Sequence, residues 1–234
     1  MIRIAVDGPA SSGKSSVGRL VAHELGIGFL DTGLLYRAIT RRAVDLGYLV
    51  QPLSASEMLG EGHAGLRQLL ADLAAITDAR GDGASFGIVV GEMPMSETEL
   101  EASDVELHVP SVASLPGVRD ALRSVQRGVA ARGGALLAGR DIGTVVLPDA
   151  DCKVFLDASA EERARRRAQQ RGFALDSIEH RQILEGLIAR DAEDRSRTVA
   201  PLRAADDAVV IRTDSMTIDE VVRQVVSVAR AAIR

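Results

Sequence analysis

The chain has 234 residues, of which 46% are hydrophobic and 26% charged, with no tryptophan and a single cysteine, Cys152. This length accommodates one α/β domain with an insertion, or one large and one small lobe. The formal net charge of -5 argues against a general nucleic-acid binder, and no window approaches the roughly eighteen consecutive apolar residues of a membrane span. A lone cysteine cannot form an internal disulfide, and an opening strand argues against a cleaved signal peptide. We therefore expect a cytoplasmic protein that binds neither nucleic acid nor membrane.

The first motif is the segment Gly8–Ser15, which reads GPASSGKS and has the spacing of a phosphate-binding loop. A short apolar strand, residues 2–7, precedes it, and an amphipathic helix follows. Glycines let successive backbone N–H groups point inward, and the helix offers its positive end, so a polyphosphate finds donors already in place. Lys14 can reach the β and γ phosphates, and the Ser15 hydroxyl can bind a magnesium ion that bridges them.

The alternative is a glycine- and serine-rich turn that carries a lysine by chance. Four specified positions make such a match rare, on the order of one in a thousand for a chain of this size. Lysine usage also favours the phosphate loop, because Lys14 and Lys153 are the only lysines in an arginine-rich chain. This pattern indicates that a compact point charge is required at position 14. Heavy arginine usage can also reflect a GC-rich genome, and this alternative applies to the arginine clusters below.

A second strand and helix follow the loop. Residues 28–31 form an expected short strand, and Thr32 and Gly33 lead into a helix that carries Tyr36 and Arg37. Polar groups at the end of a strand lie where open α/β folds bind ligands. The alternative is a helix cap with an exposed arginine.

The periodicity changes in the next segment. Residues 54–74 have helical spacing, and residues 76–95 contain Gly-Asp-Gly between apolar runs, which predicts a small antiparallel hairpin or meander. A parallel α/β sheet needs no such hairpin, so we interpret residues 58–118 as an inserted lobe. No element is assigned to the acidic segment 100–112, and Pro116 is expected to start a helix.

A buried strand returns at residues 134–138, and Arg140 and Asp141 follow at its carboxyl end between glycines. Adjacent opposite charges at a strand terminus favour a ligand contact over a solvated turn. Residues 152–157 are expected to form a further strand.

Two arginine clusters lie in the second half. Ser159 has capping-box spacing and opens a helix. This helix carries four arginines: Arg163, Arg165, Arg166 and Arg167. A second helix begins near Asp176 and ends in a group in which Arg190, Asp194 and Arg197 share one face. Such clusters are common on solvated faces, but beside a phosphate loop they are more simply interpreted as clamps that neutralise charge on a transferring phosphoryl group.

The last expected elements are a strand at residues 207–212 and a helix capped by Thr217. The four histidines are scattered without metal-ligand spacing, and no cysteine-histidine or GxSxG constellation occurs. Strand-loop-helix units therefore repeat around one parallel sheet, and the chemistry expected there depends on positioning and electrostatics, without a nucleophilic side chain.

Several segments together resemble the bacterial cytidylate kinase family, over nearly the whole chain and in the family's order. They are Gly8-Pro9 before the phosphate loop, LDTG with Tyr-Arg in residues 30–37, GRDIGTVVLPD in residues 139–149, FLDAS in residues 155–159, and Arg190-Asp191 through Pro201-Leu202. The GRDIGT segment distinguishes this family from other nucleoside monophosphate kinases. The resemblance implies transfer of the γ-phosphoryl group of ATP to CMP or dCMP, with Mg²⁺, in pyrimidine nucleotide metabolism.

The resemblance also implies a fold and its division. We expect an α/β fold with a P-loop NTPase-type parallel sheet flanked by helices, an inserted monophosphate-binding lobe with a small antiparallel sheet, and a short lid. The kinase core would comprise residues 1–57 and 119–234, the lid about 159–172, and the inserted lobe 58–118. We expect a monomer whose partners are its small-molecule substrates.

The matching motifs assign site residues. The resemblance gives ATP binding to Gly8, Pro9, Ala10, Ser11, Ser12, Gly13, Lys14, Ser15, Ser16, Arg163 and Arg166. It gives CMP binding to Thr32, Tyr36, Arg37, Arg119, Arg140, Asp141, Arg190 and Asp194. Catalytic roles fall to Lys14, Arg140, Arg190 and Arg197, and the metal contact to Ser15. Arg119 and Asp141 would read the base, because a guanidinium plus a carboxylate complements the two acceptors and the amino donor of cytosine.

The chain departs from the family pattern at three positions. Glu101 stands where an arginine is common, Pro110 lies near the position of a small base-contacting hydroxyl residue, and Ala138 replaces a frequent acidic residue. These changes leave the phosphate chemistry intact but weaken base contacts from the inserted lobe and the outer coordination of magnesium. Asp7 is a candidate for that outer coordination.

Two other functions remain open. A kinase for another small acceptor, such as a different monophosphate or a shikimate-like metabolite, would keep the phosphate loop, although Arg119 and Asp141 favour a pyrimidine. A binding module that uses nucleotide as a switch would need an acidic magnesium strand and a guanine-reading motif. Neither occurs in the sequence, and the second arginine cluster would then have no task.

Overall fold

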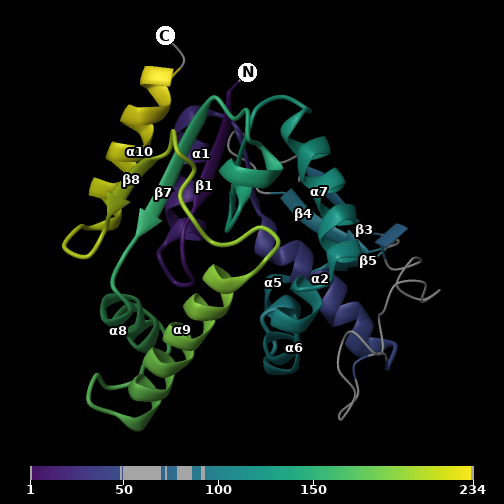
Figure 1. The fold of residues 1–234 in the computed structure, drawn as a ribbon, viewed down its shortest axis with the longest axis vertical. Helices are drawn as coiled ribbons and strands as arrows, with labels where there is room; N and C mark the ends of the chain where they lie inside the picture. Colours follow the sequence, from purple (N-terminus) through teal and green to yellow (C-terminus); the bar gives the residue numbers. More distant parts are fainter. Residues whose placement is uncertain are drawn as a thin grey trace.

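The computed structural model describes residues 2–47, 49, 70–71, 73–77, 86–90 and 93–232. Its centre is a five-stranded parallel sheet in the order β2-β6-β1-β7-β8. The strands are β1 (Arg3–Asp7), β2 (Gly28–Asp31), β6 (Ala135–Gly139), β7 (Cys152–Asp157) and β8 (Val209–Arg212). Figure 1 shows helices on both sides of this sheet. The predicted α/β fold with a flanked parallel sheet is confirmed.

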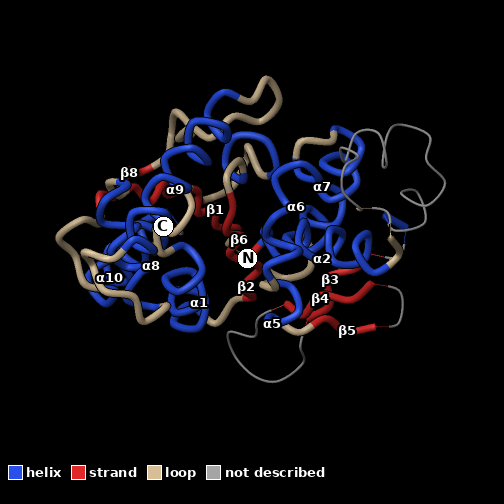
Figure 2. The backbone as a smooth tube through the Cα atoms, turned by 90° about the horizontal axis from the view of Figure 1, so that it is seen from below, coloured by secondary structure: helices blue, strands red, loops and turns tan. Residues whose placement is uncertain are grey.

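Both faces of the sheet are covered by amphipathic helices. One face carries α1 (Lys14–Leu25) and α10 (Ile218–Ala232), and the other carries α2 (Thr32–Asp45) and α7 (Pro116–Ala130) (Figure 2). The alternation of side chains along β1 sends Ile4 and Val6 toward α1 and α10, and Ala5 toward α2 and α7. Because both faces are buried, these strands are continuously apolar, which is the pattern recognised in the sequence.

A three-stranded antiparallel sheet lies beside α2. It consists of β3 (Leu73–Thr77), β4 (Phe86–Val90) and β5 (Met93–Met95) in that order. Phe86, Ile88 and Val90 are buried in the same core cluster as α2 and α7. The predicted antiparallel sheet is confirmed, whereas the turn sequence expected at residues 81–83 lies outside the described residues.

Two further segments of this lobe were considered in the sequence analysis. The helix expected over residues 54–74 lies mostly outside the described residues, and strand β3 already begins at Leu73. The segment 100–112, which received no element, is helical: α5 (Glu97–Leu100) precedes α6 (Ser103–Ala113). Pro110 inside α6 weakens the helical signal, because proline in a helix interior removes a backbone hydrogen bond.

Two helices, α8 (Ala160–Gln170) and α9 (Ile178–Ser196), pack on each other and project beyond the carboxyl edge of the sheet (Figure 1). Ser159 Oγ accepts a 3.2 Å hydrogen bond from the backbone N–H of Glu162, so the predicted cap is confirmed. Ser177 caps α9, slightly later than the predicted start near Asp176. None of the described helices is both long and apolar enough to cross a bilayer.

Candidate active site

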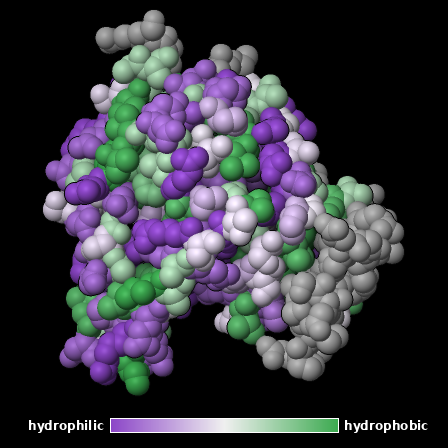
Figure 3. All heavy atoms as spheres, in the orientation of Figure 1, coloured by the Kyte–Doolittle hydropathy of each residue, from purple (hydrophilic) through white to green (hydrophobic). Residues whose placement is uncertain are grey.

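A cavity of about 1140 Å³ opens at the carboxyl edge of the parallel sheet. Its walls come from the phosphate loop, the start of α2, the end of β6, and the facing sides of α6, α8 and α9. In the space-filling view the surface is hollowed between the projecting α8–α9 pair and the lobe that carries α6 (Figure 3). These distant segments meet because parallel strands all end at one edge of the sheet.

Most of the residues proposed from the sequence line this one cavity. They are Ala10, Ser11, Ser12, Gly13, Lys14, Ser15, Ser16, Thr32, Tyr36, Arg37, Arg119, Arg140, Asp141, Arg166, Arg190, Asp194 and Arg197. Gly8, Pro9 and Arg163 are not among the lining residues, and their contacts are described below. Of the three positions that depart from the family pattern, Glu101 and Pro110 line the cavity, whereas Ala138 is buried in β6.

The phosphate loop turns on two glycines with positive φ. Gly8 has φ 153°, and a Cβ at this position would lie 2.1 Å from the carbonyl oxygen of Leu156. Gly13 has φ 89° and immediately precedes α1, which begins at Lys14. Because Gly13 has no side chain to cap the helix, the first N–H groups of α1 are left for an anion. Gly8 therefore contributes by shaping the loop.

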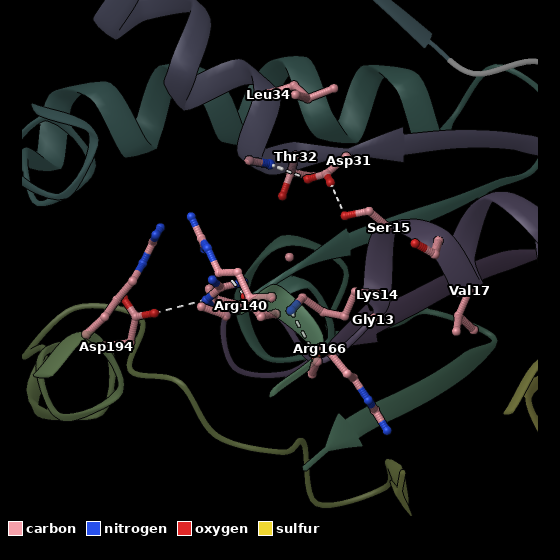
Figure 4. A pocket seen from close by; sticks show the side chains of 18 of the residues that line it. Gly13, Lys14, Ser15, Val17, Asp31, Thr32, Leu34, Arg140, Arg166 and Asp194 are labelled. Carbon is pink, nitrogen blue, oxygen red and sulfur yellow. Dashed lines mark hydrogen bonds and ion pairs between the residues drawn. The ribbon is translucent and has the colours of Figure 1, made fainter. Parts of the chain in front are cut away.

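Lys14 is buried and is oriented by its own loop (Figure 4). Its Nζ donates a 2.5 Å hydrogen bond to the carbonyl oxygen of Pro9 and a 3.2 Å bond to Ser12 Oγ. Burial lowers the pKa of Lys14 well below its usual value, and the positive charge of Arg140 lowers it further. A bound polyphosphate would supply the negative charge that favours the protonated amine.

Ser15 and Asp31 form a pair beside the loop (Figure 4). Ser15 Oγ donates a 2.5 Å hydrogen bond to Asp31 Oδ2, and Asp31 Oδ1 accepts from the backbone N–H of Gly33 at the start of α2. No group of three or more His, Cys, Asp or Glu side chains with metal-binding geometry occurs among the described residues. A hydroxyl beside a carboxylate instead suits Mg²⁺ that keeps phosphate and water ligands.

Asp7 has a different environment from the one expected for a magnesium-associated carboxylate. Its two oxygens accept hydrogen bonds of 2.8 and 2.7 Å from the backbone N–H groups of Ile142 and Gly143, in the short π-helical turn Ile142–Val146. Burial raises the pKa of Asp7 to about 6. Asp7 does not line the cavity, so its contacts are those of a buried anchor for the turn after β6.

A buried carboxylate joins the arginines of the second cluster. Asp194 accepts from Arg140 Nε at 2.9 Å and lies 2.6 Å from Arg197 Nη2 through its other oxygen. The side chain of Asp194 is only 2% exposed, so it fixes both guanidinium groups at the cavity wall. Arg190 lies one helical turn away on the same wall, and burial followed by the charge of Arg140 lowers its pKa. The predicted shared face of α9 is confirmed.

A second buried ion pair, between Arg119 and Asp141, also lines the cavity. Arg119 Nη2 donates a 2.6 Å hydrogen bond to Asp141 Oδ2, and the Arg119 guanidinium carbon lies 5.8 Å from the centre of the Tyr36 ring. Burial raises the pKa of Asp141, although the charge of Arg119 opposes this shift. Arg119 Nε is buried without a protein partner, so the pair still has a free donor.

Comparison with known proteins agrees with this geometry. Residues 4–231 match the family model described as "Cytidylate kinase". A cytidylate kinase from Limosilactobacillus fermentum is 41% identical over 96% of this chain and 93% of its own length, and one from Exiguobacterium is 39% identical over 96% and 94%. The chain belongs to the cytidylate kinase family. It is accordingly a nucleotide-binding phosphotransferase.

The fold alone is also shared with more distant proteins. The crystal structure of an uncharacterized protein from Eubacterium ventriosum covers 99% of both chains with a TM-score of 0.52 and 10% identity. At this level of identity the likeness concerns the fold alone.

The arginines of α8 differ from one another in ways that family motifs do not reveal. Arg163, assigned to ATP from the sequence, is 2% exposed and is not among the residues that line the cavity. It donates to the carbonyl oxygens of Ala10 and Ala158 and pairs with Asp191. Its assignment as a group that contacts ATP is therefore corrected: Arg163 holds the loop from behind. Arg166 does line the cavity, and it donates to Thr213 Oγ1 at 3.1 Å.

Sequence reasoning missed several cavity residues in this member of the cytidylate kinase family. Arg171, directly after α8, and Glu106 of α6 line the cavity and were not proposed, whereas Arg167 was named only as a member of the α8 arginine cluster. The loop after β8 also contributes Thr213, Met216 and Thr217, and α10 contributes Ile218. Helical spacing of Arg167 and Arg171 was a usable signal for α8, whereas nothing in the local sequence marks the residues after β8.

Proposed function

We propose that this enzyme transfers the γ-phosphoryl group of ATP to CMP or dCMP, giving ADP and CDP or dCDP. The observation that carries this proposal is that the phosphate loop and the Arg119–Asp141 pair face one cavity, with Arg140, Arg190 and Arg197 among the residues lining it. An anion-binding loop and a base-reading pair in one cavity suit two nucleotides bound with their phosphates toward each other.

The donor site comprises the phosphate loop and α8. Residues 8–16 form the loop, and the backbone N–H groups of residues 10–16 with the Lys14 amine would bind the ATP phosphates. Ser15 with Asp31 would hold Mg²⁺, which supplies charge neutralisation between the β and γ phosphates when bound. Arg166, which donates a hydrogen bond to Thr213, would contact ATP from α8.

The acceptor site lies opposite. Thr32, Tyr36 and Arg37 at the start of α2 would hold the monophosphate together with Arg140 and Arg190. Asp141 would accept a hydrogen bond from the cytosine amino group, and Arg119 would donate to its acceptors. The Arg119–Asp141 contact of 2.6 Å holds both groups in this orientation before the base arrives.

Phosphoryl transfer requires alignment and charge stabilisation more than covalent chemistry from the protein. Lys14, Arg140, Arg190 and Arg197 supply positive charge around the position of the transferred group. Asp194 keeps two of these guanidinium groups in place, so little reorganisation is needed as charge develops.

We also propose the division into a core of residues 1–57 and 119–234 and an inserted monophosphate-binding lobe of residues 58–118, with a lid at about 159–172. A monomeric state, the absence of nucleic-acid and membrane partners, and a cytoplasmic location stay predictions.

The test is ADP production with a panel of acceptors: CMP, dCMP, UMP, AMP, GMP and shikimate. We expect turnover with CMP and dCMP, dependence on Mg²⁺, and at least a ~10-fold preference over purine monophosphates, since each base-reading contact contributes about 1–3 kcal/mol. Lys14→Ala is the inactive control, with thermal unfolding to verify its fold. Equal turnover with AMP, or a preference for shikimate, would contradict the proposal.

A further inference from the structure

Two hydrogen bonds span the cavity between α6 and the end of α8. Glu106, on α6, accepts a hydrogen bond from Arg167 Nη2 and a second, at 3.3 Å, from Arg171 Nη2, both from the carboxyl-terminal end of α8. Helix α6 packs on α2 and α7, and α8 packs on α9. The two helices are therefore joined here by long side chains from opposite walls.

Arg167 is held at both ends of its guanidinium group. Nη2 donates to Glu106, while Nη1 lies 3.4 Å from Ser11 Oγ in the phosphate loop. Ser11 has φ 59°, in the left-handed region that non-glycine residues rarely adopt, and it lines the same cavity. A guanidinium group is a rigid planar fork, so fixing one nitrogen fixes the direction of the others.

Glu106 is suited to this task electrostatically. Its side chain is 31% exposed and that of Arg167 is 22% exposed, so the pair is partly withdrawn from water. Burial, which raises the pKa of the Glu106 carboxyl, is outweighed by the nearby charges of Arg167 and Arg171, and the pKa lies below its usual value. Glu106 is therefore ionised at neutral pH.

The neighbouring carboxylate on α6, Asp104, does not make such a contact. Asp104, on the same helix, pairs at 2.6 Å with Arg41 of α2, within its own lobe. Glu106 thus links the wall that would hold the acceptor to the helix beside the donor site.

We propose that Glu106 is a positioning residue that orients Arg167 toward the donor phosphates and so couples donor binding to the acceptor lobe. The proposal rests on the proposed function, because it takes the phosphate loop as the donor site and the α2–α6 side as the acceptor site. Movement of α6 when the acceptor binds would change the orientation of Arg167. Coupling between two ligands is reciprocal, so each nucleotide would then strengthen binding of the other.

The experiment is a double-mutant cycle read out by binding of the non-hydrolysable donor AMPPNP with Mg²⁺, measured by calorimetry for the wild type, Glu106→Gln, Arg167→Ala and the double variant. Loss of a partly exposed charged pair predicts that Glu106→Gln weakens AMPPNP binding about 3- to 5-fold. If Glu106 acts through Arg167, its substitution has no further effect in the Arg167→Ala background. In steady-state kinetics the KM for ATP should rise about as much, with kcat within about twofold of the wild type.

Coupling is measured as the factor by which saturating CMP tightens AMPPNP binding, and this factor should fall toward one in Glu106→Gln. Asp104→Ala is the matched control, because it removes a carboxylate from the same helix without touching the cavity. Unchanged or tighter AMPPNP binding by Glu106→Gln would overturn the proposal. It would also be overturned if Glu106→Gln weakened AMPPNP binding as much in the Arg167→Ala background as in the wild type. A wild type that binds AMPPNP but not CMP would refute the proposed function, while the cycle would still test Glu106.

Discussion

Arg163 and Asp191 form a buried ion pair behind the phosphate loop, with Arg163 Nη2 2.5 Å from Asp191 Oδ2. The two side chains are only 3% and 6% exposed. Arg163 Nη1 also donates to the carbonyl oxygen of Ala10, at 2.9 Å, which connects α8 and α9 to the loop. The charge of this arginine is therefore balanced inside the protein, and its function is to support the loop.

We expect Arg163→Met to lower the free energy of unfolding by about 3–5 kcal/mol, because it leaves Asp191 as an uncompensated buried charge. Urea denaturation measures this change. Arg165→Met is the matched control on the same helix: Arg165 is 42% exposed and pairs with Glu162, so its loss should change the free energy by less than about 1 kcal/mol. Similar effects of the two substitutions would contradict the assignment of Arg163.

The four arginines of α8 show where sequence reasoning reaches its limit. Helical periodicity places Arg163 and Arg167 on neighbouring turns of one side, but it does not say which of them meets a buried carboxylate. Asp191, which decides this, lies 28 positions further along the chain. Burial is therefore set by tertiary packing of α8 on α9, which local spacing does not specify.

The phosphate loop and the α9 cluster were predictable for a physical reason. Glycines with positive φ, a lysine and a hydroxyl at fixed spacing are local requirements of anion binding, and Arg190 and Asp194 lie one turn apart on any helix. The contact of Glu106 with Arg167 was not predictable, since it joins α6 and α8 across the cavity and α6 itself was missed.

Base recognition should depend on Asp141. We expect Asp141→Asn to raise the KM for CMP about 10- to 100-fold, because an amide retains the shape but changes the hydrogen-bonding pattern offered to cytosine. The KM for ATP should change less than about twofold, since the role proposed for Asp141 is to bind the base of CMP and not ATP. Initial rates with each substrate varied in turn separate the two constants. An equal rise in the KM for ATP and the KM for CMP would instead indicate that Asp141 maintains the fold of the site.

Asp7 should make stability depend on pH in the direction opposite to most carboxylates. Its pKa rises from the ordinary 3.8 to about 6 in the folded protein because of burial, so the native state holds the proton more tightly than the unfolded chain. The stabilising contribution of the neutral form is fully present below about pH 4 and is lost as the pH rises through about 6.

Substituting Asp7 by Asn removes this titration. We compare the free energies of unfolding of Asp7→Asn and the wild type. From pH 4 to pH 7 the variant should gain about 2–3 kcal/mol relative to the wild type, because only the wild type loses the contribution of protonated Asp7. Urea denaturation of both proteins at several pH values measures the difference. A difference that stays constant across this range would show that Asp7 titrates normally.

Gly8 should tolerate no side chain. A Cβ on Gly8 would lie 2.1 Å from the Leu156 carbonyl oxygen, and the φ of 153° is strained for any other residue. We expect Gly8→Ala to displace the loop from β7 and to reduce kcat/KM for ATP at least ~100-fold, because the N–H groups proposed to bind phosphate depend on the path of the loop. Gly186→Ala in α9 is the matched control, since a Cβ there has no heavy atom within 4 Å. That variant should keep full activity and gain up to about 1 kcal/mol of stability from its lower backbone entropy in the unfolded chain. Near-normal activity of Gly8→Ala would mean that the loop can bind phosphate along a different path, and that close packing of the loop on β7 is dispensable.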